Sequence, residues 1–333
     1  MTFLKKTHWL RMSLLPLVLL TAACSAPQAE KDAGQRSPLD GGTPSMPMMD
    51  KSQDEPLQSM IKNVKPAFQS FVYKDEQTGL SVPYNLYIPK QSIDKTPLPL
   101  VLFIADASVV GKDVTAPLVQ GYGGMIWATA ASQLKNPSFV LVPQFQTVIL
   151  DDHGSYTTSD YIELTARMTK YVSQQYNIDQ HRLYATGQSM GAMTLMLLSA
   201  KHPDLFAAQM FVAGQWDINE LSALKDQTFF YLVSAGDPKA SAGQTELYDA
   251  LTQQGTTIST AIWNARWDES QLTRAINALV EKGNRLNFVT FEKGTTLPAG
   301  TTADSPAGEH MYTFDAAYKI DAVRHWLFQQ HKE

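Results

Sequence analysis

The stretch RLYATGQSMGAMTLMLLSA, residues 182–200, decides how this sequence folds. Residues 182–186 have the composition of a strand, and residues 192–200 form a mostly apolar run typical of a buried helix. Between them lies the pentapeptide Gly-Gln-Ser-Met-Gly, residues 187–191. Glycine at both ends lets a strand and the next helix approach closely, with the serine held on the sharp turn between them. The pattern therefore predicts a strand, a strained turn and a helix, with Ser189 exposed at the amino end of the helix.

Other apolar runs repeat the strand signal of this unit. Residues 98–104 are almost continuously apolar, without the alternation of a strand that has one wet face. The same signature recurs at 139–142, 183–186, 210–213, 229–234 and 288–291. Two shorter stretches, 71–73 and 84–88, suit antiparallel edge strands, and helical periodicity lies between the buried runs, for example over 160–176. This alternation predicts one α/β domain with a doubly wound, mostly parallel sheet.

The composition is that of a large globular domain without a nucleic-acid footprint. The chain has 333 residues, of which 44% are hydrophobic, so it can bury a substantial core. Its formal net charge is -5 and its pI is about 5.8. Because a basic patch is the usual signature of nucleic-acid binding, this balance argues against a nucleic-acid partner.

The first residues differ from the rest and predict export. Basic residues at positions 5, 6 and 11 precede an apolar run, 14–20, and then small residues up to Cys24, the single cysteine of the chain. This order is typical of a signal peptide, here residues 1–23, because the run is far shorter than the roughly 20 residues that span a bilayer. Residues 20–24, Leu-Thr-Ala-Ala-Cys, resemble the lipobox of bacterial lipoproteins, although Thr21 stands where leucine is usual. The resemblance implies acylation of Cys24 and a lipid anchor in the bacterial cell envelope, at the outer membrane or cell surface. An ordinary signal peptide with an incidental cysteine is the alternative.

The sequence after the signal peptide divides into two parts. Residues 24–57 are rich in Ser, Pro, Gly, Gln and charge and poor in β-branched residues, which predicts a flexible lipidated tether. Residues 58–333 are predicted to form the single folded domain.

Ser189 has the setting of a nucleophile. Serine is a weak nucleophile at neutral pH and needs an adjacent imidazole that is itself held by a carboxylate. At the start of a helix, the backbone N–H of Met190 can stabilise an oxyanion with the help of the helix dipole. A tight glycine-rich turn without catalysis is the alternative interpretation.

His310 and Asp237 are the preferred partners of Ser189. Of the seven histidines, His310 lies in a polar stretch, 307–310, that we expect to be a loop between the last strand and the last helix. Asp237 follows the predicted strand 229–234 in a tight Gly-Asp-Pro turn. Asp217, after the preceding strand, is the rival, but it has the position of a helix N-cap.

With these residues in place, the chain resembles the extracellular esterase branch of the α/β-hydrolases. This branch includes polyhydroxybutyrate depolymerases, feruloyl and acetylxylan esterases, and prolyl-oligopeptidase-like domains. The resemblance spans about residues 98–328 and is carried by the segments 98–103, 139–144, 176–179, 187–191 and 203–208. It implies the α/β-hydrolase fold, in which the catalytic residues follow the chain order Ser, acid, His that Ser189, Asp237 and His310 reproduce.

One loop departs from the family pattern. After the first central strand the family usually has His-Gly and a small residue, where this chain has Ala-Asp-Ala-Ser, residues 105–108. That loop donates the second N–H of the oxyanion hole, a role that the resemblance assigns here to Ala107. Asp106 is expected to bring a negative charge close to the developing oxyanion.

Several side chains are predicted to lie near the substrate. Residues 254–287 are longer than a minimal crossover and are predicted to form a lid, with Trp263 and Trp267 available to stack on a ring. Trp216, just past a strand end, and His153 are further candidates for substrate contact. Plain packing is the alternative for each tryptophan.

These residues favour a serine hydrolase that cleaves small-molecule or polymeric carboxylic esters through an acyl-enzyme. A serine peptidase of prolyl-oligopeptidase type is one alternative, because an amide differs only in its leaving group. A non-catalytic surface binding protein on the same scaffold is another, motivated by the loop at 105–108. Residues 151–153, Asp-Asp-His, have ligand types suited to a divalent ion, but adjacent carboxylates more often form a solvated loop. We therefore expect neither a metal nor an organic cofactor.

Overall fold

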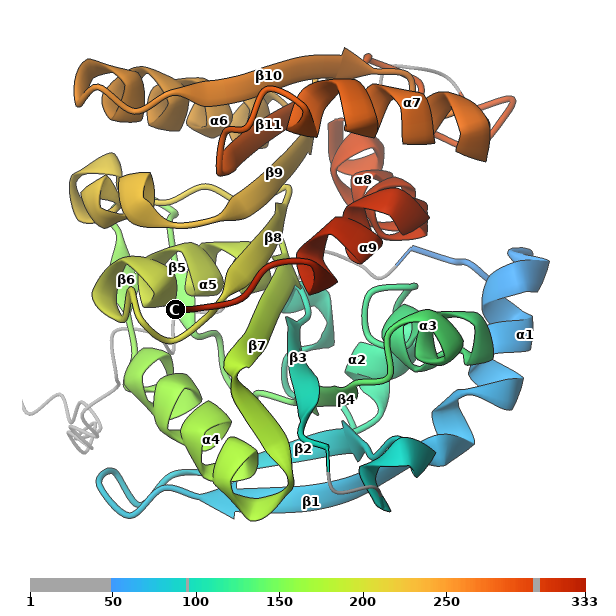
Figure 1. Ribbon diagram of the computed structural model, residues 1–333, viewed down its shortest axis with the longest axis vertical. Coiled ribbons are helices and arrows are strands. Elements are labelled where there is room, and N and C mark those ends of the chain that lie inside the picture. Colours follow the sequence, from blue (N-terminus) through green and yellow to red (C-terminus); the bar gives the residue numbers. More distant parts are fainter. Residues whose placement is uncertain (1–48, 94–95, 302–305) are drawn as a thin grey trace, which may run out of the picture. The chain divides into compact units, whose positions relative to one another are not determined.

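A large mixed sheet dominates the part of the chain that the computed structural model describes, residues 49–93, 96–301 and 306–333. Within these ranges, nine strands are joined in the order β1-β2-β4-β3-β7-β8-β9-β11-β10 (Figure 1). The strands are β1 (Phe68–Lys74), β2 (Ser81–Tyr87), β3 (Leu98–Ile104), β4 (Phe139–Pro143), β7 (Ile178–Gln188), β8 (Ala208–Val212), β9 (Phe229–Ser234), β10 (Ile258–Trp263) and β11 (Leu286–Phe291). The predicted signal peptide, Cys24 and the tether up to residue 48 lie outside the described residues.

The pairing confirms the predicted doubly wound sheet. β1 pairs antiparallel with β2, and β2 pairs antiparallel with β4. From β4 through β3, β7, β8, β9 and β11 to β10, every neighbouring pair is parallel. Every residue of β3, β4, β8 and β9 is buried. Their continuous apolar runs therefore reflect strands covered on both faces.

Helices cover both faces of the sheet. In Figure 1, α4 and α5 lie on one face, and α3, α8 and α9 lie on the other. The helices are α1 (Glu55–Asn63), α2 (Ala116–Val119), α3 (Ala130–Lys135), α4 (Tyr161–Gln175), α5 (Met190–Lys201), α6 (Pro238–Gln253), α7 (Glu269–Val280), α8 (Pro306–Lys319) and α9 (Asp321–Phe328). Among the residues that the structure describes, no helix has the length and apolar character needed to span a bilayer.

The predicted lid is wrong, because residues 254–287 extend the sheet instead. β10 forms its edge and pairs in parallel with β11, with Trp263 opposite Phe291. The indole of Trp263 is buried, and α7 packs on this strand and buries Ile276 and Leu279. The apolar side chains of this segment therefore pack a strand and a helix together and do not face a pocket.

The folded part begins earlier than the sequence predicted. Asp54 caps α1 by accepting a hydrogen bond from the N–H of Leu57 at 3.1 Å, and the Leu57 side chain is fully buried. The Nζ of Lys51 lies 2.7 Å from the Oδ2 of Asp315 in α8, and both side chains are almost completely buried. The predicted tether therefore extends too far, because residues 51–57 pack on the domain.

Candidate active site

Ser189 sits on a strained turn between β7 and α5. Its φ of 49° and ψ of -119° lie in a region that residues other than glycine rarely adopt. A Cβ on Gly187 would lie 2.5 Å from the carbonyl carbon of Gly191, and one on Gly191 would collide with the carbonyl oxygen of Ile104 in β3. The predicted strand, strained turn and helix are confirmed, and both glycines are required by close backbone contact.

The structure brings Ser189, which follows β7, and Asp237, in the loop after β9, together with His310. The Nε2 of His310 lies 2.9 Å from the Oγ of Ser189, and its Nδ1 lies 2.5 Å from the Oδ2 of Asp237. An ionised carboxylate only accepts hydrogen bonds, so Nδ1 carries the proton and Nε2 is left to accept from the serine hydroxyl. The other oxygen of Asp237, Oδ1, accepts from the N–H of Ala240 at 3.2 Å and caps α6.

His310 reaches this position from a helix and not from the predicted loop. It lies in α8, which begins at Pro306, and its ring packs edge-to-face on Phe314 with the centroids 5.1 Å apart. Proline is favoured at the first position of a helix because its missing N–H would have no partner there. That proline was the sequence signal for the helix.

Asp217 takes the capping role that the sequence offered as its alternative. It precedes a short 3-10 helix, Ile218–Glu220, and its Oδ1 accepts from the backbone N–H of Asn219 at 3.0 Å. The same oxygen accepts from the Nδ2 of Asn219 at 2.8 Å. Of the two acid candidates, Asp237 is the one in contact with His310.

The residues expected to form an oxyanion hole lie at two helix starts. Met190 is the first residue of α5, and Ala107 begins a 3-10 helix, Ala107–Val109. The Asp106 carboxylate is buried and accepts from the N–H of Ser108 at 2.7 Å. It also accepts from the Nε2 of Gln188 at 2.8 Å and from the side-chain amide of Gln120. Its charge is thus held in a buried network that includes the residue before Ser189.

The predicted aromatic contacts are only partly available to a substrate. Trp263 lies in the core, and Trp267 packs against the core from a loop. Trp216 is buried and donates from Nε1 to the Oε2 of Glu220 at 2.7 Å. Tyr156 is half-exposed and packs on Trp216 with ring centroids 5.0 Å apart.

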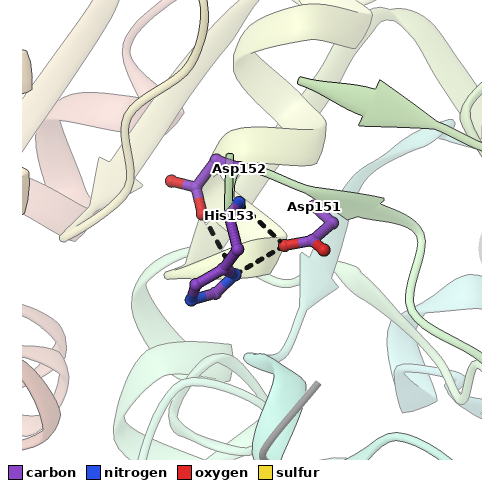
Figure 2. Close-up of side chains that lie close together, drawn as sticks. All are labelled: Asp151, Asp152 and His153. Carbon is purple, nitrogen blue, oxygen red and sulfur yellow. Dashed lines mark hydrogen bonds and ion pairs between the residues drawn. The ribbon is translucent and has the colours of Figure 1, made fainter. Parts of the chain in front are cut away.

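His153 and two acids lie in the hairpin formed by β5 (Leu150–Asp151) and β6 (Thr157–Thr158). Figure 2 shows the His153 ring beside both carboxylates. Its Nδ1 lies 2.5 Å from Oδ1 of Asp151 and 3.7 Å from Oδ1 of Asp152. One candidate ligand atom from each residue lies within 4.8 Å of the others. Asp152 is also bound by the Nζ of Lys239 at 2.7 Å, so an ammonium group already neutralises this carboxylate.

Comparisons with known proteins find relatives over part of the chain. The model of the prolyl oligopeptidase family matches residues 143–294. A probable acetylxylan esterase A of Aspergillus flavus is 32% identical over 95 residues, which cover 28% of this chain and 25% of that protein. An acetylxylan esterase A of Emericella nidulans is 33% identical over 95 residues, again 28% and 25% of the two chains. The chain thus spans about a quarter of the length of these relatives.

Solved structures extend the similarity to most of the domain. A crystal structure of a thermostable esterase superposes with a TM-score of 0.64 at 23% identity, covering 81% of this chain and 64% of the other. The chain has the α/β-hydrolase fold. A mutant of the feruloyl esterase module from Clostridium thermocellum, complexed with sinapinate, superposes with a TM-score of 0.55 at 13% identity, covering 87% and 96%. In this fold, the nucleophile turn, the acid loop and the His310 helix follow β7, β9 and β11, in the predicted chain order.

Proposed function

We propose that this α/β-hydrolase is a serine hydrolase that cleaves carboxylic esters through an acyl-enzyme. The observation that carries the proposal is the connected pair of contacts from Ser189 Oγ to His310 Nε2, 2.9 Å, and from His310 Nδ1 to Asp237 Oδ2, 2.5 Å. Hydrogen-bonded nucleophile, base and orienting acid are the geometry that activated serine requires.

The residues define two chemical steps. Oγ of Ser189 attacks the ester carbonyl carbon while its proton passes to Nε2 of His310, and Asp237 stabilises the resulting imidazolium. When the tetrahedral intermediate collapses, the C–O bond to the alcohol breaks and the alcohol leaves with the proton from Nε2. Water then attacks the acyl-enzyme with His310 again as base. The carboxylic acid departs and Ser189 regains its proton.

In this proposal, backbone N–H groups stabilise the oxyanion of the tetrahedral intermediate. The N–H groups of Met190 and Ala107 are the donors we assign to it, and the amino end of α5 adds favourable partial charge. The buried bonds of Asp106 to Ser108, Gln120 and Gln188 support a structural role for its carboxylate, which holds this loop against the nucleophile turn. The unusual side chain at position 106 is therefore compatible with a working oxyanion hole, since the donors are backbone groups.

Esters are favoured over amides as substrates because the matched relatives and superposed structures are named as esterases. A serine peptidase is the second candidate, because the prolyl oligopeptidase family model matches residues 143–294 and the same three residues would serve an amide. A small-molecule or polymeric ester is the proposed substrate.

The decisive experiment is labelling with a fluorophosphonate probe, comparing the wild type with Ser189→Ala. Labelling that disappears in the variant is expected, followed by hydrolysis of short p-nitrophenyl esters well above that of aminoacyl anilides. Faster hydrolysis of the anilides would move the assignment to a peptidase. Absence of labelling in the wild type would refute the proposed chemistry and favour a binding protein on this scaffold.

The proposed location is the cell envelope, through acylation of Cys24 after removal of residues 1–23. The support is the lipobox-like sequence before Cys24. Cys24→Ser is expected to move the protein from the membrane fraction to the soluble exported fraction. A variant that stays in the membrane fraction would contradict the lipid anchor.

A further inference from the structure

Glu309 is a buried carboxylate to which the proposed mechanism gives no role. It directly precedes His310 in α8, and its relative exposure is 0%. Removing an ionised carboxylate from water costs several kcal/mol unless hydrogen bonds replace its hydration. An apolar side chain would fill the same space without that cost. The carboxylate therefore needs an explanation in the bonds that it makes.

Its hydrogen bonds reach two separate loops. Oε2 accepts from the Oγ of Ser234 and from the Oγ1 of Thr296, each at 2.6 Å. Oε1 accepts from the backbone N–H of Gly294. Ser234 is the last residue of β9, whereas Gly294 and Thr296 follow β11. These bonds match the acceptor-only character of an ionised carboxylate.

The contact with Ser234 reaches the loop that carries Asp237. The Oγ of Ser234 also accepts from the N–H of Gly236 at 3.1 Å, and the N–H of Asp237 donates to the carbonyl of Ser234 at 3.0 Å. A Cβ on Gly236 would collide with the carboxyl group of Glu309. The side chain of Glu309 is therefore packed directly on the backbone that leads to the acid.

We infer that Glu309 is a positioning residue that fastens the acid loop, residues 234–237, to the helix that bears His310. The inference rests on the proposed function and deepens it. Through Ser234, Glu309 fixes the distance between Asp237 Oδ2 and His310 Nδ1, the contact that orients the base. Glu309 does not touch substrate, because its side chain is fully buried. Misplacing a catalytic group by about 1 Å costs about a hundredfold in rate.

The sharpest test compares two single-donor deletions. Ser234→Ala and Thr296→Val each remove one hydroxyl that donates to the same Oε2 at 2.6 Å, but only Ser234 belongs to the acid loop. We expect Ser234→Ala to lower kcat by about tenfold with KM unchanged, the signature of an interaction needed in the transition state. Thr296→Val is expected to keep the wild-type kcat. Equal kcat values in the two variants would overturn the inference.

Variants at position 309 test the carboxylate itself. Glu309→Ala is expected to lower kcat by about a hundredfold at constant KM. Glu309→Gln is expected to recover most of this loss, because its carbonyl still accepts and the two hydroxyls can turn to accept from its amide. Asp315→Ala is the matched control, because it removes another buried carboxylate of α8 that binds Lys51 instead of the acid loop. It is expected to lower thermal stability without lowering kcat per folded molecule.

A readout that does not need turnover separates this inference from the proposed function. The proton shared by His310 Nδ1 and Asp237 Oδ2 is expected to give a far-downfield proton NMR signal. The signal should shift or vanish in Ser234→Ala and Glu309→Ala and persist in Thr296→Val and Asp315→Ala. An unchanged signal in the first two variants would overturn the role of Glu309 even if the enzyme is active. A wild type that shows the signal but no labelling of Ser189 would refute only the proposed function.

Discussion

Replacing Asp237 with Asn tests how His310 is oriented. The Oδ1 of Asp237 accepts from the N–H of Ala240 at 3.2 Å, and Oδ2 lies 2.5 Å from the Nδ1 of His310. Asparagine keeps an oxygen for the cap but offers an NH2 group to the imidazole. Nδ1 must then accept instead of donate, so the proton moves to Nε2. In that tautomer Nε2 can no longer take the proton of Ser189.

The magnitude follows from this loss of the correct tautomer. A substitution of this kind lowers kcat by about 10⁴, which is about 5.4 kcal/mol of activation free energy at 1.36 kcal/mol per tenfold. The fold should hardly change, because Asn and Asp are about equally good N-caps. The free energy of unfolding is therefore expected to stay within about 1 kcal/mol of the wild type.

The assay is kcat/KM for a p-nitrophenyl ester, with Asp217→Asn as the matched control. Asp217 also caps a helical turn after a strand, through the N–H of Asn219 at 3.0 Å, and it is the rival acid on sequence grounds. We expect wild-type activity in Asp217→Asn. Wild-type activity in Asp237→Asn, or a loss in Asp217→Asn instead, would refute the assignment of the acid.

Three further changes probe the backbone, the fold and the substrate side. Gly191→Ala should lower kcat by about a hundredfold, because its Cβ collides with a β3 carbonyl beside the nucleophile turn. Steady-state hydrolysis of a p-nitrophenyl ester measures this. Asp75→Asn should lower the free energy of unfolding in urea by about 3 kcal/mol, because Asp75 is buried and accepts from Arg167 at 2.7 and 2.8 Å. These bonds also hold the pKa of Asp75 well below its usual range, so the folded state keeps the charge while the unfolded state takes up a proton. This contribution to stability is therefore present above about pH 4 and is lost as the pH falls further, which acid titration of wild type and Asp75→Asn can measure. Tyr156→Ala removes a half-exposed ring that packs on Trp216 and should raise KM for esters that carry a sugar or aryl ring but not for a simple alkyl acetate. Tyr171→Ala, which removes a similarly exposed ring on α4, should change neither value.

The central strands could be predicted because their physical signal is local. Residues 98–104 and 229–234 were predicted with the same bounds that the structure gives, since a strand buried on both faces has no polar alternation. β10 could not be recognised this way. Its exposed Ile262 and buried Trp263 are neighbours in an edge strand with one open face, so β10 lacks the continuous apolar run that marks the central strands. Its β-branched and aromatic residues favour a strand, but only its pairing with β11 shows that it extends the sheet.

The three proposed catalytic residues could be predicted from the sequence, but the side chain that positions them could not. The Gly-Gln-Ser-Met-Gly motif, the Gly-Asp-Pro turn and a histidine after the last strand selected Ser189, Asp237 and His310. Parallel strands bring their carboxyl ends to one edge of the sheet, so residues that follow them can meet. The role of Glu309 depends on Ser234 and Thr296, which lie 75 and 13 residues away in sequence. Glutamate beside a histidine in a polar stretch has the pattern of a solvated loop. Only the three-dimensional contacts distinguish a buried carboxylate from an exposed one.

Helix ends place the three proposed catalytic residues. Ser189 directly precedes α5, and Asp237 caps α6 through its Oδ1 while its Oδ2 holds the imidazole. His310 lies in the first turns of α8, so the direction of its side chain is set by a helix and not by a loop. Such a base is only as well placed as its helix, and the bond between Glu309 and Ser234 ties that helix to the loop of the acid. This explains why a carboxylate lies buried beside the base without touching it.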